Sequence, residues 1–170
     1  MKPLDSVQIG VTSLDSAKKN MEGKNIFFSN DSILGKPSVI GYEKKFRWAW
    51  MATQLNTFIC VSDFDGHEVN NKVMEEYLNE SYDYAKKHYS GWPKGLQSGL
   101  GVISIIISSN LGNDVIEYCH KLSSGKKWAG FTIPVVIDAN NGKVHSFDKN
   151  PMWGRIYYPH FRAMIDELTK

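Results

Sequence analysis

Two aspartates separated by one residue follow an apolar stretch in residues 58–66, which read FICVSDFDG. The β-formers before them predict a strand, so Asp63 and Asp65 are expected where that strand ends. Two carboxylates this close repel each other unless a cation lies between them. A purely structural interpretation competes with a catalytic one. In it, Asp63 ends the strand and Asp65 caps the next helix, with Glu68 completing a capping box.

The same stretch resembles the first motif of the haloacid dehalogenase superfamily, an apolar strand that ends in Asp-x-Asp-Gly. The resemblance implies a phosphohydrolase that needs Mg²⁺, with Asp63 as nucleophile and Asp65 as general acid/base. Asp138 would join these two residues as a metal ligand. Ser108, at the end of another apolar stretch, would supply the family's second motif. We treat this activity as the alternative hypothesis.

Residues 152–161, MWGRIYYPHF, form a second candidate site. Aromatic side chains with polar tips, together with an arginine, are the residues that binding surfaces overuse. Loops on a rigid scaffold are also where binding sites collect. Our leading hypothesis is therefore a binding or interaction module for an unidentified protein or small molecule. The expected binding residues are Trp153, Arg155, Tyr157, Tyr158 and His160, with Lys94 and Gln97 from a glycine-rich loop.

A third candidate alternates aromatic and basic side chains in residues 38–50. Tyr42, Phe46, Trp48 and Trp50 would share one face of a strand, as in a platform on which unpaired nucleic-acid bases stack. The alternation directs Glu43, Lys45 and Arg47 to the opposite face, away from the rings. We therefore expect core packing for the rings and a solvated charged face. The glycines at 95, 99 and 101 precede a strand, not a helix, and so predict close packing instead of a phosphate-binding loop.

The hydrophobic pattern predicts the scaffold that positions these candidates. Residues 100–107 are the most apolar stretch, and we expect them to form the central strand of a sheet, buried on both faces. Amphipathic helices are predicted from Asp65 to about residue 88, from Asn110 to about residue 124, and from Pro159 onward. An Asn-Asn-Gly turn at 140–142 predicts a hairpin.

Helices interleaved with strands indicate an α/β protein with a mixed β-sheet and helices packed on it, and α+β is the alternative class. A single domain is expected over residues 1–170, and residues 1–24 are expected to be its least tightly packed part, a candidate N-terminal arm.

Composition narrows the classes of function. The net charge is +2, from 20 basic and 18 acidic residues, so neither a nucleic-acid partner nor an anionic membrane is expected. The two cysteines, Cys60 and Cys119, lie in apolar segments and predict buried free thiols. We expect no cofactor under the leading hypothesis, and Mg²⁺ under the alternative. The chain has no apolar stretch long enough to cross a membrane and no secretory signal, so a cytoplasmic protein is expected.

Overall fold

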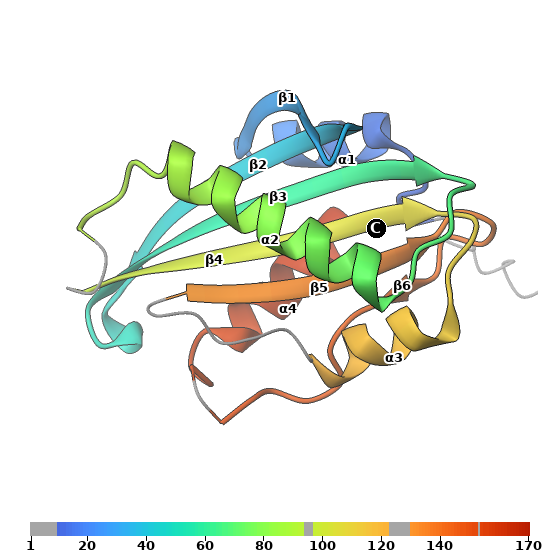
Figure 1. Cartoon of the computed structure of the whole chain (residues 1–170). Coiled ribbons are helices and arrows are strands. Elements are labelled where there is room, and N and C mark those ends of the chain that lie inside the picture. The colour runs from blue at the N-terminus through green and yellow to red at the C-terminus, as the bar shows by residue number, and fades with distance from the viewer. Residues whose placement is uncertain (1–9, 94–96, 123–129, 153) are drawn as a thin grey trace, which may run out of the picture.

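A six-stranded β-sheet organises the chain, whose computed structural model describes residues 10–93, 97–122, 130–152 and 154–170 (Figure 1). Its strands follow chain order from edge to edge: β1 (Phe27–Ile33), β2 (Lys36–Arg47), β3 (Thr53–Asp65), β4 (Ser98–Ser108), β5 (Gly130–Asp138) and β6 (Val144–His145). Strands β1, β2 and β3 are antiparallel, β3, β4 and β5 are parallel, and β6 returns antiparallel. The mixed sheet predicted from the sequence is therefore confirmed.

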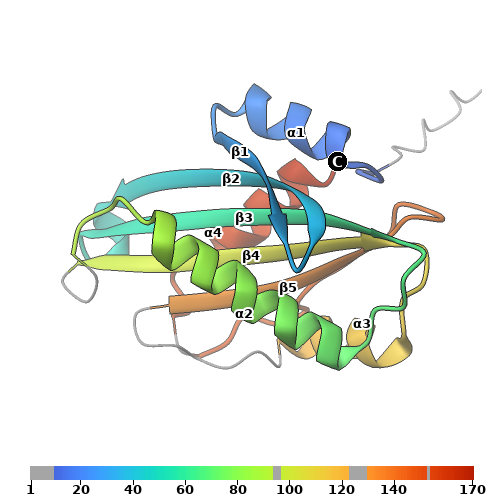
Figure 2. The ribbon, with the colours of Figure 1, turned by 45° about the horizontal axis from the view of Figure 1, so that its top comes forward.

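Helices cover both faces of the sheet (Figure 2). Helices α2 (Asn71–His88) and α3 (Asn113–Lys121) pack on one face, and α1 (Leu14–Gly23) and α4 (Tyr158–Leu168) pack on the other. Each face has its own hydrophobic core, so the molecule is one α/β domain of three layers. Within the described ranges, none of these helices is long and apolar enough to cross a membrane.

Strand β4 is the central, fully buried strand that the sequence predicts. All 11 of its residues are buried, because neighbouring side chains alternate between the two cores. Ile105 faces α1 and α4, whereas Ile106 faces α2 and α3. Gly101 shows why this strand contains glycine. A Cβ atom there would lie 2.6 Å from the ring of Phe161 on α4, so the helix packs directly on the strand backbone.

The start of α2 differs from the prediction. The helix begins at Asn71, and its N-cap is Asn70, whose side chain accepts a hydrogen bond from the amide of Val73 at 3.0 Å. Asp65 instead ends β3, with a φ of 52°, and lies opposite Ser108 of β4. The capping role predicted for Asp65 is therefore wrong. Strand pairing with β4 holds the chain extended past the position where the local pattern predicts a helix.

The second predicted helix also begins later than expected, at Asn113 with Gly112 as its N-cap residue, and not at Asn110.

Residues 14–23 form the well-packed helix α1, not a loose arm. Ala17 and Met21 of this helix are buried in the core beneath α4. The amide of Asn20 donates hydrogen bonds to the carbonyls of Leu168 at 2.8 Å and Lys170 at 3.1 Å. Helix carbonyls at a C-terminus lack partners within their own helix, so Asn20 both satisfies α4 and fixes α1 beside it.

Two further local predictions are confirmed. Strands β5 and β6 form the expected hairpin, and Gly142 in its turn adopts a φ of 73°, a conformation that glycine tolerates best. Cys60 and Cys119 are free and buried. Burial raises the pKa of both thiols to about 12, so neither is a reactive thiolate near neutral pH.

Candidate functional site

The predicted binding segment divides into buried and exposed residues. Tyr158 is buried, its ring packs against Phe131 and Phe161, and burial raises the pKa of its hydroxyl to about 12. Tyr157 is half-buried, with its ring 5.7 Å from that of Trp50. Both tyrosines thus close the core. Arg155 is exposed, as is Gln97 on the loop before β4. Trp153 and Lys94 lie outside the described residues.

The three aspartates of the alternative hypothesis lie at neighbouring strand ends. Asp65 pairs in register with Ser108, and Ser108 pairs with Asp138. Two of the three carboxylates accept hydrogen bonds from nearby backbone amides. Asp63 Oδ1 accepts from the amide of Asp65 at 2.8 Å, and Asp138 Oδ1 accepts from a turn amide at 2.9 Å. Within the described part of the chain, no group of three or more His, Cys, Asp or Glu side chains is placed to hold a metal ion. This geometry adds no support for a phosphohydrolase.

His160 leads instead to a pocket of about 440 Å³ between α1, β2 and α4. Its walls combine the end of α1, one face of β2 and the inner side of α4. The charged and polar side chains that line it are Lys24, Glu43, Lys45, Arg47, His160 and Glu167. Three of them, Glu43, Lys45 and Arg47, alternate along β2 and so share one strand face.

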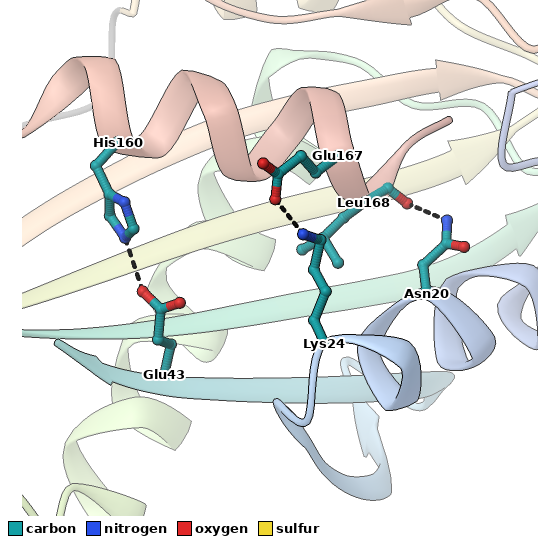
Figure 3. A network of polar contacts seen from close by, with 6 residues as sticks. All are labelled: Asn20, Lys24, Glu43, His160, Glu167 and Leu168. Carbon is teal, nitrogen blue, oxygen red and sulfur yellow. Dashed lines mark hydrogen bonds and ion pairs between the residues drawn. The ribbon is translucent and has the colours of Figure 1, made fainter.

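A hydrogen bond between His160 and Glu43 forms one wall of the pocket (Figure 3). The imidazole Nε2 lies 2.7 Å from Glu43 Oε1, and the two side chains are only 7% and 23% exposed. Burial by itself would raise the pKa of Glu43. The hydrogen bond from His160 and the positive charges of His160, Lys45 and Arg47 outweigh burial, and they hold the pKa of the Glu43 carboxyl below its ordinary value.

The ionised carboxylate therefore fixes the imidazole. Because a carboxylate only accepts hydrogen bonds, Nε2 is the donor. Nδ1 is the ring nitrogen that this bond leaves unused. A carboxylate that orients a histidine in this way is one part of an acid–base pair, although a buried structural tie uses the same geometry.

The basic side chains of the pocket differ in whether they have an ion-pair partner. Lys24 forms an ion pair with Glu167, which lowers the pKa of that carboxyl (Figure 3). The guanidinium carbon of Arg47 lies 4.8 Å from the centre of the Trp50 ring, and Trp50 also packs against His160. Within the described residues, neither Lys45 nor Arg47 forms a hydrogen bond or a close ion pair. Their N–H donors are therefore available to a ligand.

The sequence points to His160 but not to its surroundings. The pattern on β2 separates Glu43, Lys45 and Arg47 from the rings of Tyr42 and Phe46, and this alternation is the signal that a charged face exists. It is wrong for Trp50, whose ring lies against Arg47 and His160. It does not reveal that α4 covers part of that face. Lys24 and Glu167 give no sequence signal at all, because only the packing of α1 beside α4 brings them together.

Comparison of the chain with known protein families, with curated proteins and with solved structures found no match. We therefore infer the function from the geometry of the pocket.

Proposed function

We propose that this protein is a binding module whose pocket between α1, β2 and α4 takes a small ligand with an anionic group, such as a phosphate or a carboxylate. One observation carries the proposal. Both carboxylates of the pocket already have partners, Glu43 in His160 and Glu167 in Lys24, whereas Lys45 and Arg47 have no acceptor among the described residues. Besides His160, the lining contains three basic and two acidic side chains, so basic groups are in excess.

Chemistry and shape support an anion over other small ligands. An ammonium and a guanidinium together offer several N–H donors, and a guanidinium fits carboxylate or phosphate oxygens with two parallel bonds. The stacking of Arg47 on the buried Trp50 ring limits the motion of the guanidinium, so less freedom is lost on binding. The pocket volume of about 440 Å³ is in the ordinary range for small-molecule sites.

His160 links this proposal to the segment that the sequence favours. It is the residue of that segment that lines the pocket, among those described. In the proposed complex it occupies one carboxylate oxygen of Glu43 by a hydrogen bond, so that Glu43 competes less with the anionic ligand for the donors of Lys45 and Arg47.

Isothermal titration calorimetry with inorganic phosphate at low ionic strength tests the proposal. Wild-type protein should bind phosphate, and the double variant Lys45→Gln/Arg47→Gln should bind at least about tenfold more weakly. Lys72→Gln, which removes an exposed lysine on α2, is the matched control and should bind as the wild type does. Equal phosphate binding by the wild type, the double variant and the control would contradict the proposal, as would no measurable binding of phosphate or acetate.

A further inference from the structure

A separate surface, at the end of the sheet where β3, β4 and β5 begin, exposes a cluster of aromatic side chains. This aromatic end patch consists of Phe46, Trp48, Met51 and Trp92, which are 40%, 81%, 82% and 44% exposed. The Phe46 ring is 5.2 Å from Trp48 and 5.7 Å from Trp92, so the three rings form one group. The exposure of Phe46 and Trp48 corrects the expectation that these rings pack in the core.

The backbone explains this exposure. Strand β2 ends at Arg47, and residues Trp48–Trp50 form a 3₁₀ turn, η1, which breaks the two-residue alternation of the strand. Trp50 is thereby directed into the core beneath α4, and Trp48 is left pointing into solvent. Fully exposed tryptophan is uncommon in a surface without a binding role, and here it neighbours two further exposed rings.

Charge is concentrated at the same end. The described residues of the chain segments 44–56, 89–101, 122–132 and 152–158 include four Lys or Arg and three tryptophans, and no Asp or Glu. The strand pairings Arg47 with Thr53, Gln54 with Ser98, and Leu100 with Gly130 bring the described parts of the first three segments to one end. That end lies at the left of Figure 1.

Two described cations belong to this surface: Lys44, which shares the strand face of Phe46, and Arg155 on the fourth segment, whereas Lys45 and Arg47 lie on the opposite face of β2 and line the anion pocket. Tyr157 places the fourth segment beside the others, since its ring contacts both Trp50 and Phe131.

From this juxtaposition we infer that the aromatic end patch is a binding surface for single-stranded nucleic acid. Exposed flat rings stack on unpaired bases, and adjacent lysines and arginines neutralise the phosphates. The near-zero net charge of the whole chain, which predicts no such partner, conceals this concentration of positive charge. An anionic lipid surface would match the charge equally well and is one arm of the test below; the grouping of three exposed rings, which offer faces for successive bases, is the observation on which we choose single-stranded nucleic acid. The surface is distinct from the proposed anion pocket, because none of its four residues lines that pocket.

Fluorescence anisotropy of a labelled oligodeoxythymidylate of about twelve nucleotides tests the inference. Wild-type protein should bind this oligonucleotide more tightly than a duplex of equal length. Trp48→Ala and Trp92→Ala should each weaken binding by roughly 5- to 100-fold. Leu34→Ala removes an exposed apolar side chain in the β1–β2 turn, at the opposite end of the sheet, and should bind as the wild type does. Lys44→Gln/Arg155→Gln should reduce the slope of log affinity against log salt by about 1.4.

Two results would overturn the inference. One is that the wild type does not bind the oligonucleotide, or that both tryptophan variants bind it as tightly as the wild type does. The other is binding of phosphatidylserine vesicles, but not of the oligonucleotide, through Trp48 and Trp92. Loss of phosphate binding in Lys45→Gln/Arg47→Gln, with oligonucleotide binding and its dependence on Trp48 retained, would leave both proposals standing separately. Circular dichroism melts verify that each variant is folded.

Discussion

His160 on α4 and Glu43 on β2 are 117 positions apart in the sequence, yet their side chains are joined by a hydrogen bond of 2.7 Å. This bond ties the last helix to the second strand at the border of the anion pocket. Because both side chains are largely buried, the bond is expected to stabilise the fold as well as to shape the pocket.

A double-mutant cycle measures that stabilisation. Glu43→Gln, His160→Gln and the double variant should give a coupling energy of about 1–2 kcal/mol in urea unfolding, after allowance for the partly exposed carboxylate. The pair Lys86 and Asp83 on α2, joined at 2.8 Å on the exposed surface, is the control and should couple more weakly, because solvent screens an exposed ion pair. Coupling of His160 with Glu43 no larger than that of the surface pair would show that the buried bond contributes little.

The same bond predicts how stability depends on pH. Burial tends to raise the pKa of Glu43, but His160, Lys45 and Arg47 together lower it below its ordinary value of 4.5. A carboxyl with a lowered folded pKa stabilises the protein above its unfolded pKa and loses that contribution as pH falls through the folded value. The difference in unfolding free energy between wild type and Glu43→Gln should therefore shrink from about pH 6 to about pH 3. A difference that stays constant in urea titrations over this range would exclude the assignment.

Ile105, only 1% exposed on the central strand, tests the packing of the core beneath α1 and α4. Ile105→Ala should lower the unfolding free energy by about 2–5 kcal/mol, because it removes buried methyl groups and leaves a cavity. Ile156→Ala, at a position that is 44% exposed, is the matched control and should change it by less than about 1 kcal/mol. Chemical denaturation measures both, and a loss below about 1 kcal/mol for Ile105→Ala would place this side chain outside a packed core.

Gly101 tests the contact of α4 with β4. A methyl group there would meet the Phe161 ring at 2.6 Å, so Gly101→Ala should destabilise the protein by about 1–3 kcal/mol. In a Phe161→Leu background, Gly101→Ala should cost less than it does in the wild type, since the smaller side chain makes room for the methyl group. Gly23→Ala is the control, because a Cβ atom at Gly23 has no heavy atom within 4 Å. A lower melting temperature for Gly23→Ala than for Gly101→Ala would contradict the close approach of α4 to β4.

The N-cap of α2 distinguishes the observed helix start from the one that the local pattern predicts. Asn70→Ala should cost about 0.5–2 kcal/mol, because it removes the acceptor for the amide of Val73. Asp65→Asn should have little effect, since asparagine tolerates the positive φ at this position as well as aspartate does. No measurable cost of Asn70→Ala in urea unfolding would exclude Asn70 as the cap; Asp65→Asn is only the control, since asparagine caps a helix as well as aspartate does.

Elements whose cause is local could be predicted from the amino-acid pattern alone. The continuous apolar stretch of β4 predicts a strand that is buried on both faces, and the Asn-Asn-Gly turn favours a hairpin. Both features follow from the types of residues within a short segment. The stripes of α2 and α4 likewise give their amphipathic helices. Local pattern was less reliable at element ends, as Asp65 shows, because pairing with β4 competes with helix formation there.

Tertiary contacts determine which helix covers the charged face of β2 and which aromatic rings stay exposed. A two-residue alternation tells which side chains share a face, but it holds no information about the distant helix that covers that face. Glu43 therefore became a partner of His160, and Trp48 an exposed ring, through contacts and a 3₁₀ turn that periodicity does not encode. The four basic, aromatic segments are far apart along the chain. Parallel pairing of β3, β4 and β5 brings the described parts of the first three to one end, because strands that run in the same direction begin at the same end of the sheet. The contacts of the Tyr157 ring with Trp50 and Phe131 place the fourth beside them.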